Sequence, residues 1–344
     1  MKVIDLRSDT VTLPSDEMRQ AIFDAQLGDD VFQEDENVNL LEKKAAQLSG
    51  KEAALLVPSG TMGNLISFLV HCPRGTEAIL GNKSHTFIYE AGGISAFGGV
   101  HSHQLPNDDQ GLIDLELIEQ AIRIDNVHFP KTSLISLENT HNRCFGSPIS
   151  KEYIDTVASI ASSHNLKLHI DGARIFNAAV ALNVSLSELV TNVDSITFCL
   201  SKGLSCPVGS VICGSKDFIY HARRTRKALG GGMRQAGIIA AAGLSILDDT
   251  EDQIRLDHIN AHTLATGISE IDGLDTNLAQ VKTNIIYFEL TAKHINSTQL
   301  LEKMEDAGIL FFEVSPNCYR LVTHYGIDES DIEFTISMFK KNLS

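Results

Sequence analysis

The sequence lacks the patterns that would place it in a membrane or an oxidising compartment. No run of 18 apolar residues is present, and residues 1–7 contain no apolar segment of signal-peptide length. The six cysteines form no Cys-x-x-Cys motif, and in a chain of 344 residues this scatter is typical of buried thiols in a reducing compartment. We therefore expect a cytoplasmic protein.

The sequence is also poor in positive charge. Its 28 Lys and Arg residues against 44 Asp and Glu residues give a net charge of −16. Nucleic acids and anionic membranes are bound through an excess of basic side chains, so neither partner is expected. Neither Gly-x-Gly-x-x-Gly nor Gly-x-x-x-x-Gly-Lys-Ser/Thr occurs, which removes the main support for a dinucleotide or nucleoside-triphosphate site.

What the sequence does contain is an alternation of apolar runs and helical periodicity. Helical spacing is clearest at 38–48, 115–124 and 151–163. Such alternation predicts an α/β protein with a mainly parallel sheet. The seven runs that we expect to form strands are 53–57, 77–80, 99–103, 133–137, 166–170, 195–200 and 209–213.

The pattern changes near residue 252. We therefore expect residues 1–250 to form a large domain and residues 251–344 a small C-terminal α+β domain. The later elements are expected to be a charged helix at 254–268, a strand at 284–290, a helix at 297–307, a strand at 319–323 and a last helix from residue 328.

Two of the apolar runs end in residues of opposite charge. Asp171 ends one run and Lys202 follows the next. Ligands of parallel sheets bind beyond the carboxyl ends of the strands, so both side chains are expected at one edge. Pyridoxal phosphate requires this pair, because a lysine amine forms an aldimine with its aldehyde and a carboxylate keeps its pyridine nitrogen protonated. Taken singly, Asp171 could be a helix cap and Lys202 a solvated strand end.

Two further positions suit the same cofactor. Gly60 and Thr61 stand where a strand turns into a helix, so free N–H groups, the helix dipole and a hydroxyl could hold a phosphate. His85 follows the strand at 77–80 and could stack on the cofactor ring opposite Asp171. A surface-loop histidine is the alternative interpretation of His85.

Several cationic positions have two interpretations each. Arg174 suits an anion site or a structural ion pair, and the pattern leaves both open. Arg320, in the predicted strand 319–323, could bind the carboxylate of an α-amino acid through a bidentate guanidinium, or it could be exposed. The basic segment 223–235 could be a solvated helix end or a phosphate-facing segment supplied by a neighbouring subunit. His101 and His103 would share a strand face, but they have no third ligand, so no metal site is expected.

With these residues assembled, the chain resembles the low-specificity L-threonine and L-allo-threonine aldolases. These are pyridoxal phosphate enzymes of the aspartate-aminotransferase-like fold, also called fold type I. The resemblance extends over nearly the whole chain and implies a large domain with a seven-stranded sheet. The matching segments are 4–12, 28–31, 57–64, 138–142, 169–177, 199–203, 230–235 and 320–324.

The resemblance implies a role for each matching residue. Lys202 would form the internal aldimine, Asp171 would pair with the pyridinium, and His85 would stack on the ring. Both His85 and His128 would lie near the substrate β-hydroxyl as catalytic residues. The other implied assignments are Gly60, Thr61 and Arg174 on the cofactor, Ser8, Arg174 and Arg320 on the substrate carboxylate, and Lys227 and Arg234 on the phosphate of a partner subunit.

The implied activity is retro-aldol cleavage of L-threonine or L-allo-threonine to glycine and acetaldehyde, or of related substrates to another aldehyde. The implied assembly is a homotetramer of dimers that share active sites, with the N-terminal segment contributing to each site. Another enzyme of this fold, namely a β-eliminating lyase, a transaminase or a racemase, is the alternative. An inactive binding protein is disfavoured because Lys202 and Asp171 are both present.

Two segments depart from the family pattern. Residues 31–36 are Val-Phe-Gln-Glu-Asp-Glu, where the family usually has Val-Tyr-Gly-Glu-Asp-Pro. The loss of the tyrosine hydroxyl, the glycine and the proline predicts a changed loop at the edge of the active site. Residues 143–146 also depart from the common forms, without a clear consequence.

Overall fold

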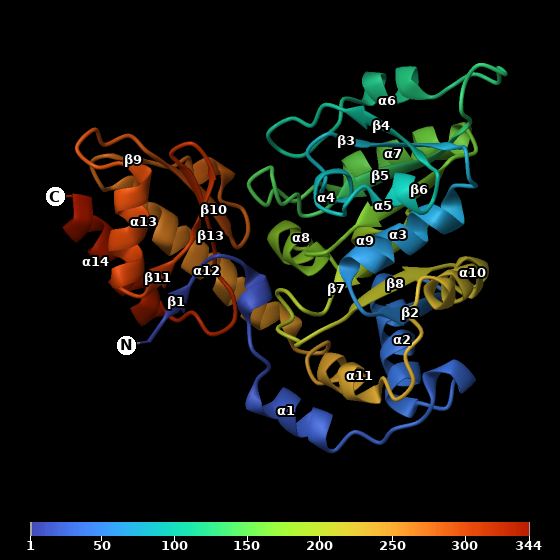
Figure 1. The fold of residues 1–344 in the computed structure, drawn as a ribbon, viewed down its shortest axis with the longest axis horizontal. Coiled ribbons are helices and arrows are strands. Elements are labelled where there is room, and N and C mark those ends of the chain that lie inside the picture. The colour runs from blue at the N-terminus through green and yellow to red at the C-terminus, as the bar shows by residue number, and fades with distance from the viewer. Residues whose placement is uncertain (1, 344) are drawn as a thin grey trace.

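A seven-stranded sheet forms the centre of the larger lobe in the computed structural model, which describes residues 2–343 (Figure 1). Its strands are β2 (Ala53–Val57), β3 (Glu77–Gly81), β4 (His101–Leu105), β5 (Thr132–Glu138), β6 (Lys167–Asp171), β7 (Ser195–Cys199) and β8 (Ser210–Gly214). They are ordered β2-β8-β7-β6-β5-β3-β4, and only β8 is antiparallel to its neighbours. The predicted mainly parallel sheet is therefore confirmed.

Helices cover both faces of this sheet (Figure 1). Strands β3, β7 and β8 are buried at every residue, as expected of strands covered on both sides. The helices of this lobe are α1 (Asp16–Phe23), α2 (Glu36–Ser49), α3 (Gly60–His71), α4 (His85–Ile88), α5 (Gly93–Ala96), α6 (Leu115–Ala121), α7 (Lys151–Ser163), α8 (Ile175–Leu182), α9 (Leu186–Leu189), α10 (Lys216–Ala228) and α11 (Gly237–Leu244), with 3-10 turns η1 (Asp9–Val11) and η2 (Asp30–Phe32).

Capping residues fix the ends of several of these helices. Ser59 and Ser150 cap α3 and α7 by accepting a hydrogen bond from the backbone three residues on. Gly50 ends α2 in the left-handed conformation, with φ at 64°. The Ala-rich sequence at 233–248 predicts one long helix, but α11 is shorter, because Gly230 to Gln235 form an irregular segment before it.

Asp35 fixes the loop that departs from the family pattern. This wholly buried carboxylate caps α2 at Val38 N–H and accepts hydrogen bonds from the backbone N–H groups of Gly28, at 3.1 Å, and Gly237, at 2.9 Å. Gln33 stands in place of the family's glycine and adopts φ 59°, a left-handed conformation that costs a non-glycine residue about 1 kcal/mol. The loop accommodates Gln33 at that cost because Asp35 anchors it on three sides.

The smaller lobe is built on a four-stranded antiparallel sheet in the order β12-β13-β10-β9. Its core contains Phe288 and Tyr319, which stack with ring centroids 4.9 Å apart, and Phe339. Its elements are β9 (Leu274–Asp275), β10 (Ile285–Leu290), β11 (Ile309–Leu310), β12 (Phe312–Ser315), β13 (Cys318–Val322), α12 (Thr250–Ser269), α13 (Ser297–Asp306), α14 (Glu329–Leu343) and the 3-10 turn η3 (Leu278–Gln280).

The N-terminal segment packs first on this smaller lobe and then crosses to the larger one (Figure 1). Strand β1 (Ile4–Asp5) pairs in parallel with β11, and Ile4 and Leu6 belong to the core of the smaller lobe. Helix α12 contacts α8 of the larger lobe as well as α14. The N-terminal segment and helix α12 each contact both lobes. The domain boundary after residue 250 therefore stays a prediction.

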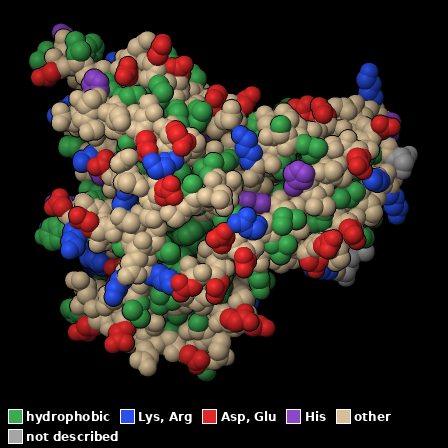
Figure 2. All heavy atoms as spheres, turned by 180° about the vertical axis from the view of Figure 1, so that it is seen from behind, with side chains coloured by type: hydrophobic (Ala, Val, Ile, Leu, Met, Phe, Trp, Pro, Cys, Tyr) green, Lys and Arg blue, Asp and Glu red, His purple; other side chains and the backbone are tan. Residues whose placement is uncertain are grey.

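The surface of the described chain carries the charge expected from the composition. Figure 2 shows acidic side chains on both lobes of the rear face. None of the helices within residues 2–343 combines the length and apolar character needed to span a membrane. All six cysteines are free thiols, and five of them are buried.

Candidate active site

A cavity of about 900 Å³ lies where the two lobes meet the N-terminal segment. It opens at the carboxyl ends of the parallel strands, the edge where ligands of such sheets bind. Five residues predicted from the sequence line it: Ser8, His85, Arg174, Lys202 and Arg320. The structure therefore brings together side chains that lie up to 312 positions apart in sequence, counting from Ser8 to Arg320.

Asp171 and Lys202 lie at this edge as predicted. Asp171 is the last residue of β6 and is buried, and its Oδ1 accepts a hydrogen bond from Ala173 N–H at 3.2 Å. Burial and the neighbouring Glu138 charge raise the pKa of Asp171, while the charges of His85 and Lys202 oppose that rise. Lys202 follows β7, and its Nζ makes no hydrogen bond or ion pair with any residue in 2–343.

His85 is held by two buried carboxylates. It is the first residue of α4, and its backbone N–H donates to Glu138 Oε2 at 2.6 Å. Its Nδ1 lies 2.9 Å from Glu90 Oε1. Although burial acts to lower it, the pKa of His85 is raised, because the Glu90 hydrogen bond and the Asp171 charge stabilise the imidazolium. Ligand atoms of His85, Glu90 and Asp171 lie within 4.8 Å of one another, so the ring and the Asp171 carboxylate face a common space.

The turn at Gly60 approaches the end of β7 closely. A Cβ added to Gly60 would stand 2.9 Å from Cys199 Sγ, so the backbone reaches this position only without a side chain. Gly60 begins α3, and Thr61 beside it is exposed. The buried hydroxyls of Thr197 and Ser210, on the strands next to this turn, have no hydrogen-bond partner in the described part of the chain.

These features fit pyridoxal phosphate. The helix N-terminus at Gly60 suits the phosphate, the unpaired Lys202 amine suits the aldehyde, and the buried Asp171 carboxylate suits a protonated pyridine nitrogen. No cationic side chain within residues 2–343 donates a hydrogen bond to Asp171, so the carboxylate is available to such a cation.

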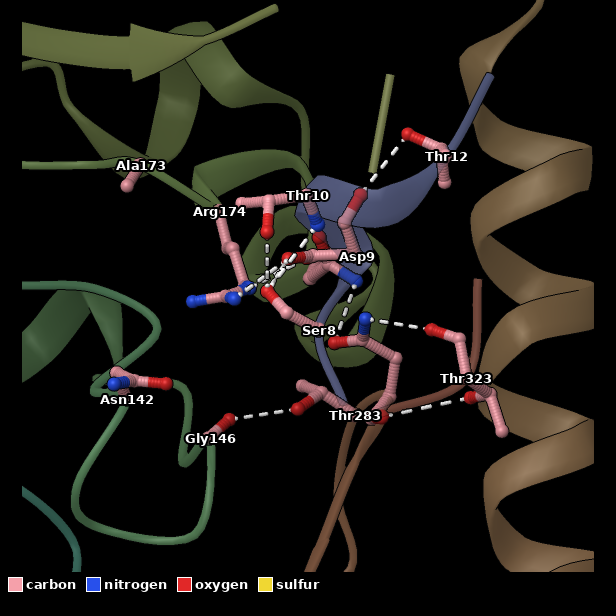
Figure 3. Close-up of polar contacts among 12 residues, drawn as sticks. Ser8, Asp9, Thr10, Thr12, Asn142, Gly146, Ala173, Arg174, Thr283 and Thr323 are labelled. Atoms are coloured by element: carbon pink, nitrogen blue, oxygen red, sulfur yellow. Dashed lines mark hydrogen bonds and ion pairs between the residues drawn. The ribbon is translucent and has the colours of Figure 1, made fainter. Parts of the chain in front are cut away.

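Arg174 forms the structural ion pair that the sequence left open, and its anion-binding role stays a prediction. Its Nε and Nη2 donate to the two carboxylate oxygens of Asp9, at 2.6 and 2.7 Å, in a fully buried bidentate pair (Figure 3). Ser8 lies beside the pair and caps the turn η1 by accepting from Thr10 N–H at 3.2 Å. Since Nη1 is not used by Asp9 and Arg174 lines the cavity, the guanidinium can also face an anion there.

Arg320 is positioned by the loop after β5. Its Nη1 donates to Asn142 Oδ1 at 2.9 Å and its Nη2 to the Arg7 carbonyl at 3.0 Å. Tyr287 OH holds the same loop by donating to the Asn142 carbonyl at 3.0 Å. Arg320 lines the cavity, and its buried Nε has no hydrogen-bond partner within residues 2–343.

Six of the eleven predicted site residues do not line the cavity of their own chain. Asp171 ends β6 and Gly60 and Thr61 begin α3, while the other three lie elsewhere. His128 lies in the exposed segment before β5, at the opposite end of that strand from the cavity. Lys227 is exposed near the end of α10, and Arg234 forms an ion pair with Asp29 at 3.0 Å. Within one chain the predicted contacts of these residues are therefore not made, and their roles stay predictions about a shared site.

The remaining basic and histidine clusters have structural partners. Arg226 pairs with the buried Asp30 at 2.6 Å, which supports the interpretation of segment 223–235 as mainly structural. His101 and His103 do share a strand face, and the Nδ1 atoms of both lie within 3.2 Å of the buried Glu77 carboxylate. Arg123 also binds Glu77 at 3.2 Å, so this carboxylate already has a cationic partner.

Four site residues were missed by reasoning from the sequence. Asp9, Glu138 and Asn142 stand inside segments that match the family pattern, but neither periodicity nor spacing shows which side chain each one contacts. Glu90 belongs to no matching segment and had no signal in the sequence beyond its position five residues after His85.

The comparisons with known proteins agree with this geometry. A family model described as beta-eliminating lyase matches residues 5–291. A probable low-specificity L-threonine aldolase 2 of Arabidopsis thaliana is 48% identical over 345 residues, which cover 99% of this chain and 97% of the relative. The chain belongs to the beta-eliminating lyase family and, within it, to the threonine aldolases.

Other relatives of this lyase show the breadth of the family. The alanine racemase TOXG of Cochliobolus carbonum is 34% identical over 345 residues, which cover 97% of this chain and 86% of the relative. A solved structure of Leishmania major threonine aldolase superposes with a TM-score of 0.85, covering 99% of this chain and 100% of that one at 17% identity. That likeness confirms the predicted fold.

The buried pair of Asp9 and Arg174 yields a pH prediction. Although burial opposes it, the charge of Arg174 and its hydrogen bonds lower the pKa of Asp9 to about 2. A lowered carboxyl pKa stabilises the fold above the ordinary value near 4, and this stabilisation is lost as pH falls towards 2. At pH 7, Asp9→Asn should cost about 3 kcal/mol, because it leaves a buried guanidinium without its counter-charge.

Asp5→Asn is the matched control. Asp5 binds Arg7 in the same bidentate manner, but both side chains are partly exposed, so its loss should cost about 0.5 kcal/mol. Thermal unfolding should show a much larger shift for Asp9→Asn, constant from pH 8 to 5 and shrinking below about pH 4. Equal shifts for the two variants, or a gap that closes near pH 6, would contradict the account.

Proposed function

We propose that this lyase cleaves L-threonine and L-allo-threonine, and related β-hydroxy-α-amino acids, to glycine and an aldehyde, with pyridoxal phosphate attached through Lys202. One observation carries the proposal: an unpaired lysine, a positioned histidine and two arginines line one cavity, and the buried Asp171 carboxylate lies within 4.8 Å of that histidine. Two relatives named as low-specificity L-threonine aldolases, which match this chain over nearly their full length, support it.

The arginine side of the cavity suits the carboxylate of an amino acid. Arg320 lines the cavity with its guanidinium held by Asn142, and Arg174 offers the Nη1 that Asp9 leaves unused. Ser8 lies next to Arg174 and adds a hydroxyl. Because Asn142 and Asp9 fix both guanidinium groups in advance, little side-chain entropy is lost when a carboxylate binds.

The opposite side suits the chemistry at the amine and the α-carbon. When bound, pyridoxal phosphate supplies a cationic ring that accepts the electron pair released by Cα–Cβ cleavage. Asp171 would keep a proton on the ring nitrogen, since a buried carboxylate is most stable beside a cation. Lys202 Nζ, which has no protein partner, would be free to carry a proton to or from the α-carbon.

His85 is the group best placed to take the proton from the substrate β-hydroxyl. It lines the cavity, and its Nδ1 is already engaged by Glu90, which leaves Nε2 as the nitrogen with a free lone pair in the neutral ring. Removal of this proton starts Cα–Cβ cleavage, because the oxygen electrons then form the aldehyde carbonyl.

A different reaction of the same family is the competing function. The family description names β-elimination, and one relative is named an alanine racemase. These reactions need the same lysine and carboxylate, so the cavity alone does not separate them. The cleaved bond separates them, because only aldol cleavage releases acetaldehyde from threonine.

The proposed function is tested by product analysis. Purified protein with pyridoxal phosphate should form acetaldehyde and glycine from both L-threonine and L-allo-threonine, measured with NADH and alcohol dehydrogenase. Lys202→Ala should abolish this activity and the absorbance above 400 nm. Formation of a keto acid with ammonia, of a transamination product or of D-alanine from L-alanine, without acetaldehyde, would refute the aldolase assignment.

We also propose that the chain forms a homotetramer in which pairs of subunits share active sites. His128, Lys227 and Arg234 lie outside the cavity of their own chain, yet they match the site pattern of the threonine aldolases. Phe23 and Phe32 expose 84% and 68% of their surface, which a neighbouring subunit would cover.

Mixed assembly tests the sharing of sites. His128→Ala and Lys202→Ala should each lose most activity, since each removes a different side chain from every site. Refolding the two variants together should restore activity, because some sites then receive Lys202 from one chain and His128 from the other. If the mixture stays as inactive as its parts while its mass equals four times 37.5 kDa, His128 does not act across subunits.

A further inference from the structure

A continuous line of hydrogen bonds runs behind His85 through the larger lobe. Glu90 Oε1, which binds His85 Nδ1, also accepts from Asn64 Nδ2 at 2.9 Å. Asn64 Oδ1 lies 3.2 Å from His169 Nε2, and His169 Nδ1 lies 2.9 Å from Ser195 Oγ. Ser195 is the first residue of β7, so the line reaches the amino end of the strands, opposite the carboxyl ends near the cavity.

The last link is His71, whose Nε2 lies 2.7 Å from Ser195 Oγ. Asn64 and His71 begin and end two turns of α3, while His169 and Ser195 face them from β6 and β7. Asn64, His169 and Ser195 are each at most 2% exposed. No step of the family reaction proposed above uses these three residues.

The hydrogen positions in this line follow from its two ends. An ionised Glu90 only accepts, so Asn64 must turn its amide NH₂ towards it and its carbonyl oxygen towards His169. His169 Nε2 must then carry a hydrogen, and its Nδ1 accepts from the Ser195 hydroxyl. Ser195 in turn accepts from His71 Nε2–H. Every donor therefore points towards Glu90.

The two buried histidines suit this arrangement because both are neutral. Burial lowers the pKa of His169 to about 3 and that of His71 to about 4. A neutral imidazole has one donor and one acceptor, which is what each link requires. Aligned donors polarise one another and stabilise an anion at the end of the line. Glu90 needs this support, because burial and the Asp171 charge raise its pKa and, within residues 2–343, its Oε2 has no hydrogen-bond partner.

We propose that Glu90 is a positioning residue that holds His85 as its Nδ1–H tautomer, and that Asn64, His169, Ser195 and His71 form a donor relay that keeps Glu90 ionised. This inference rests on the proposed function and deepens it, since it specifies how His85 presents Nε2 to the substrate hydroxyl. It assigns a role to side chains as distant from the cavity as Ser195 and His71, near the amino end of β7.

His85 faces other charged groups, and a test must distinguish their effect on its pKa from the effect of Glu90. Asp171 faces it from β6, Lys202 from the segment after β7, and Glu138 from β5. The Tyr89 ring lies 5.5 Å from the His85 ring, centroid to centroid. Glu90→Gln leaves all four in place and removes one charge, so a shift in the pH profile reports on Glu90.

The first test compares Glu90→Gln with Glu42→Gln in the holoenzyme. Glu42 is also a buried carboxylate with a cationic partner, but it lies under α10, remote from the cavity. Glu90→Gln should lower kcat for threonine about 10- to 100-fold and weaken pyridoxal phosphate binding in an absorbance titration. Its acid limb of kcat/KM should move about one unit to lower pH, because the imidazolium of His85 loses a stabilising charge.

Glu42→Gln should keep the pH profile and the cofactor affinity of the unsubstituted protein. A Glu90→Gln variant that loses thermal stability but keeps both properties would overturn the positioning role. If the unsubstituted protein forms no acetaldehyde, the proposed function fails instead. Cofactor affinity, which needs no turnover, then decides the inference by itself.

The second test cuts the relay at Ser195. Ser195→Ala removes one hydroxyl between His169 and His71 and should move the acid limb in the same direction as Glu90→Gln, by a smaller amount. Ser67→Ala is the matched control, because Ser67 is equally buried on α3 but donates to the carbonyl of Gly63 within its own helix. Identical pH profiles for Ser195→Ala and Ser67→Ala would overturn the relay.

Discussion

Two buried carboxylates end neighbouring parallel strands side by side, and the active site is organised around them. Glu138 on β5 and Asp171 on β6 are in register, and neither is more than 6% exposed. Burial alone would raise the pKa of both groups, yet that of Glu138 is lowered, because the His141 charge and the N–H groups of Asn142 and His85 stabilise its anion. Within residues 2–343 Asp171 accepts one backbone hydrogen bond, from Ala173 N–H, so burial and the Glu138 charge raise its pKa and its charge calls for a cation from outside the protein.

The same imbalance explains why a cofactor with a basic ring nitrogen suits this fold. A pyridine nitrogen beside Asp171 completes an ion pair that the chain itself leaves incomplete. Glu90 adds a third carboxylate within 4.8 Å of Asp171, and burial and the Asp171 charge raise its pKa against the hydrogen bonds from His85 and Asn64. Side-chain and backbone donors of the protein therefore bind Glu138 and Glu90, and the Asp171 carboxylate is left available to a cationic ligand.

The amino-acid side of the site depends on contacts between the lobes. Arg320 belongs to the smaller lobe but donates to Asn142 of the larger lobe and to the Arg7 carbonyl. The N-terminal segment lies between Arg174 and helix α12, as Figure 3 shows, so Asp9 reaches Arg174 only after the chain has left the smaller lobe. Any change that separates the lobes would therefore disturb both arginines together.

The sequence was sufficient for features that depend on strand ends and helix starts. Asp171, Lys202 and Gly60 were predicted because apolar runs end there and the residue types suit one cofactor. The Asp9–Arg174 pair was left open, because 165 positions separate the partners and no periodicity links them. Strand β1 pairs with β11 through two residues, too few to show alternation. Glu90 was missed because α4 is a single short turn, whereas the predicted role of His128 is not tested within one chain, where this residue lies away from the cavity.

The most direct measurement is the site of covalent attachment of the cofactor. Protein incubated with pyridoxal phosphate, reduced with borohydride and digested should carry the cofactor mass on the peptide containing Lys202. Lys83 lines the same cavity and is the internal comparison, because its ammonium group lies 3.7 Å from Asp109 and is not adjacent to Asp171 in the sheet. Label on Lys202 alone is the predicted result. Label on Lys83, or on no lysine of the cavity, would contradict the account.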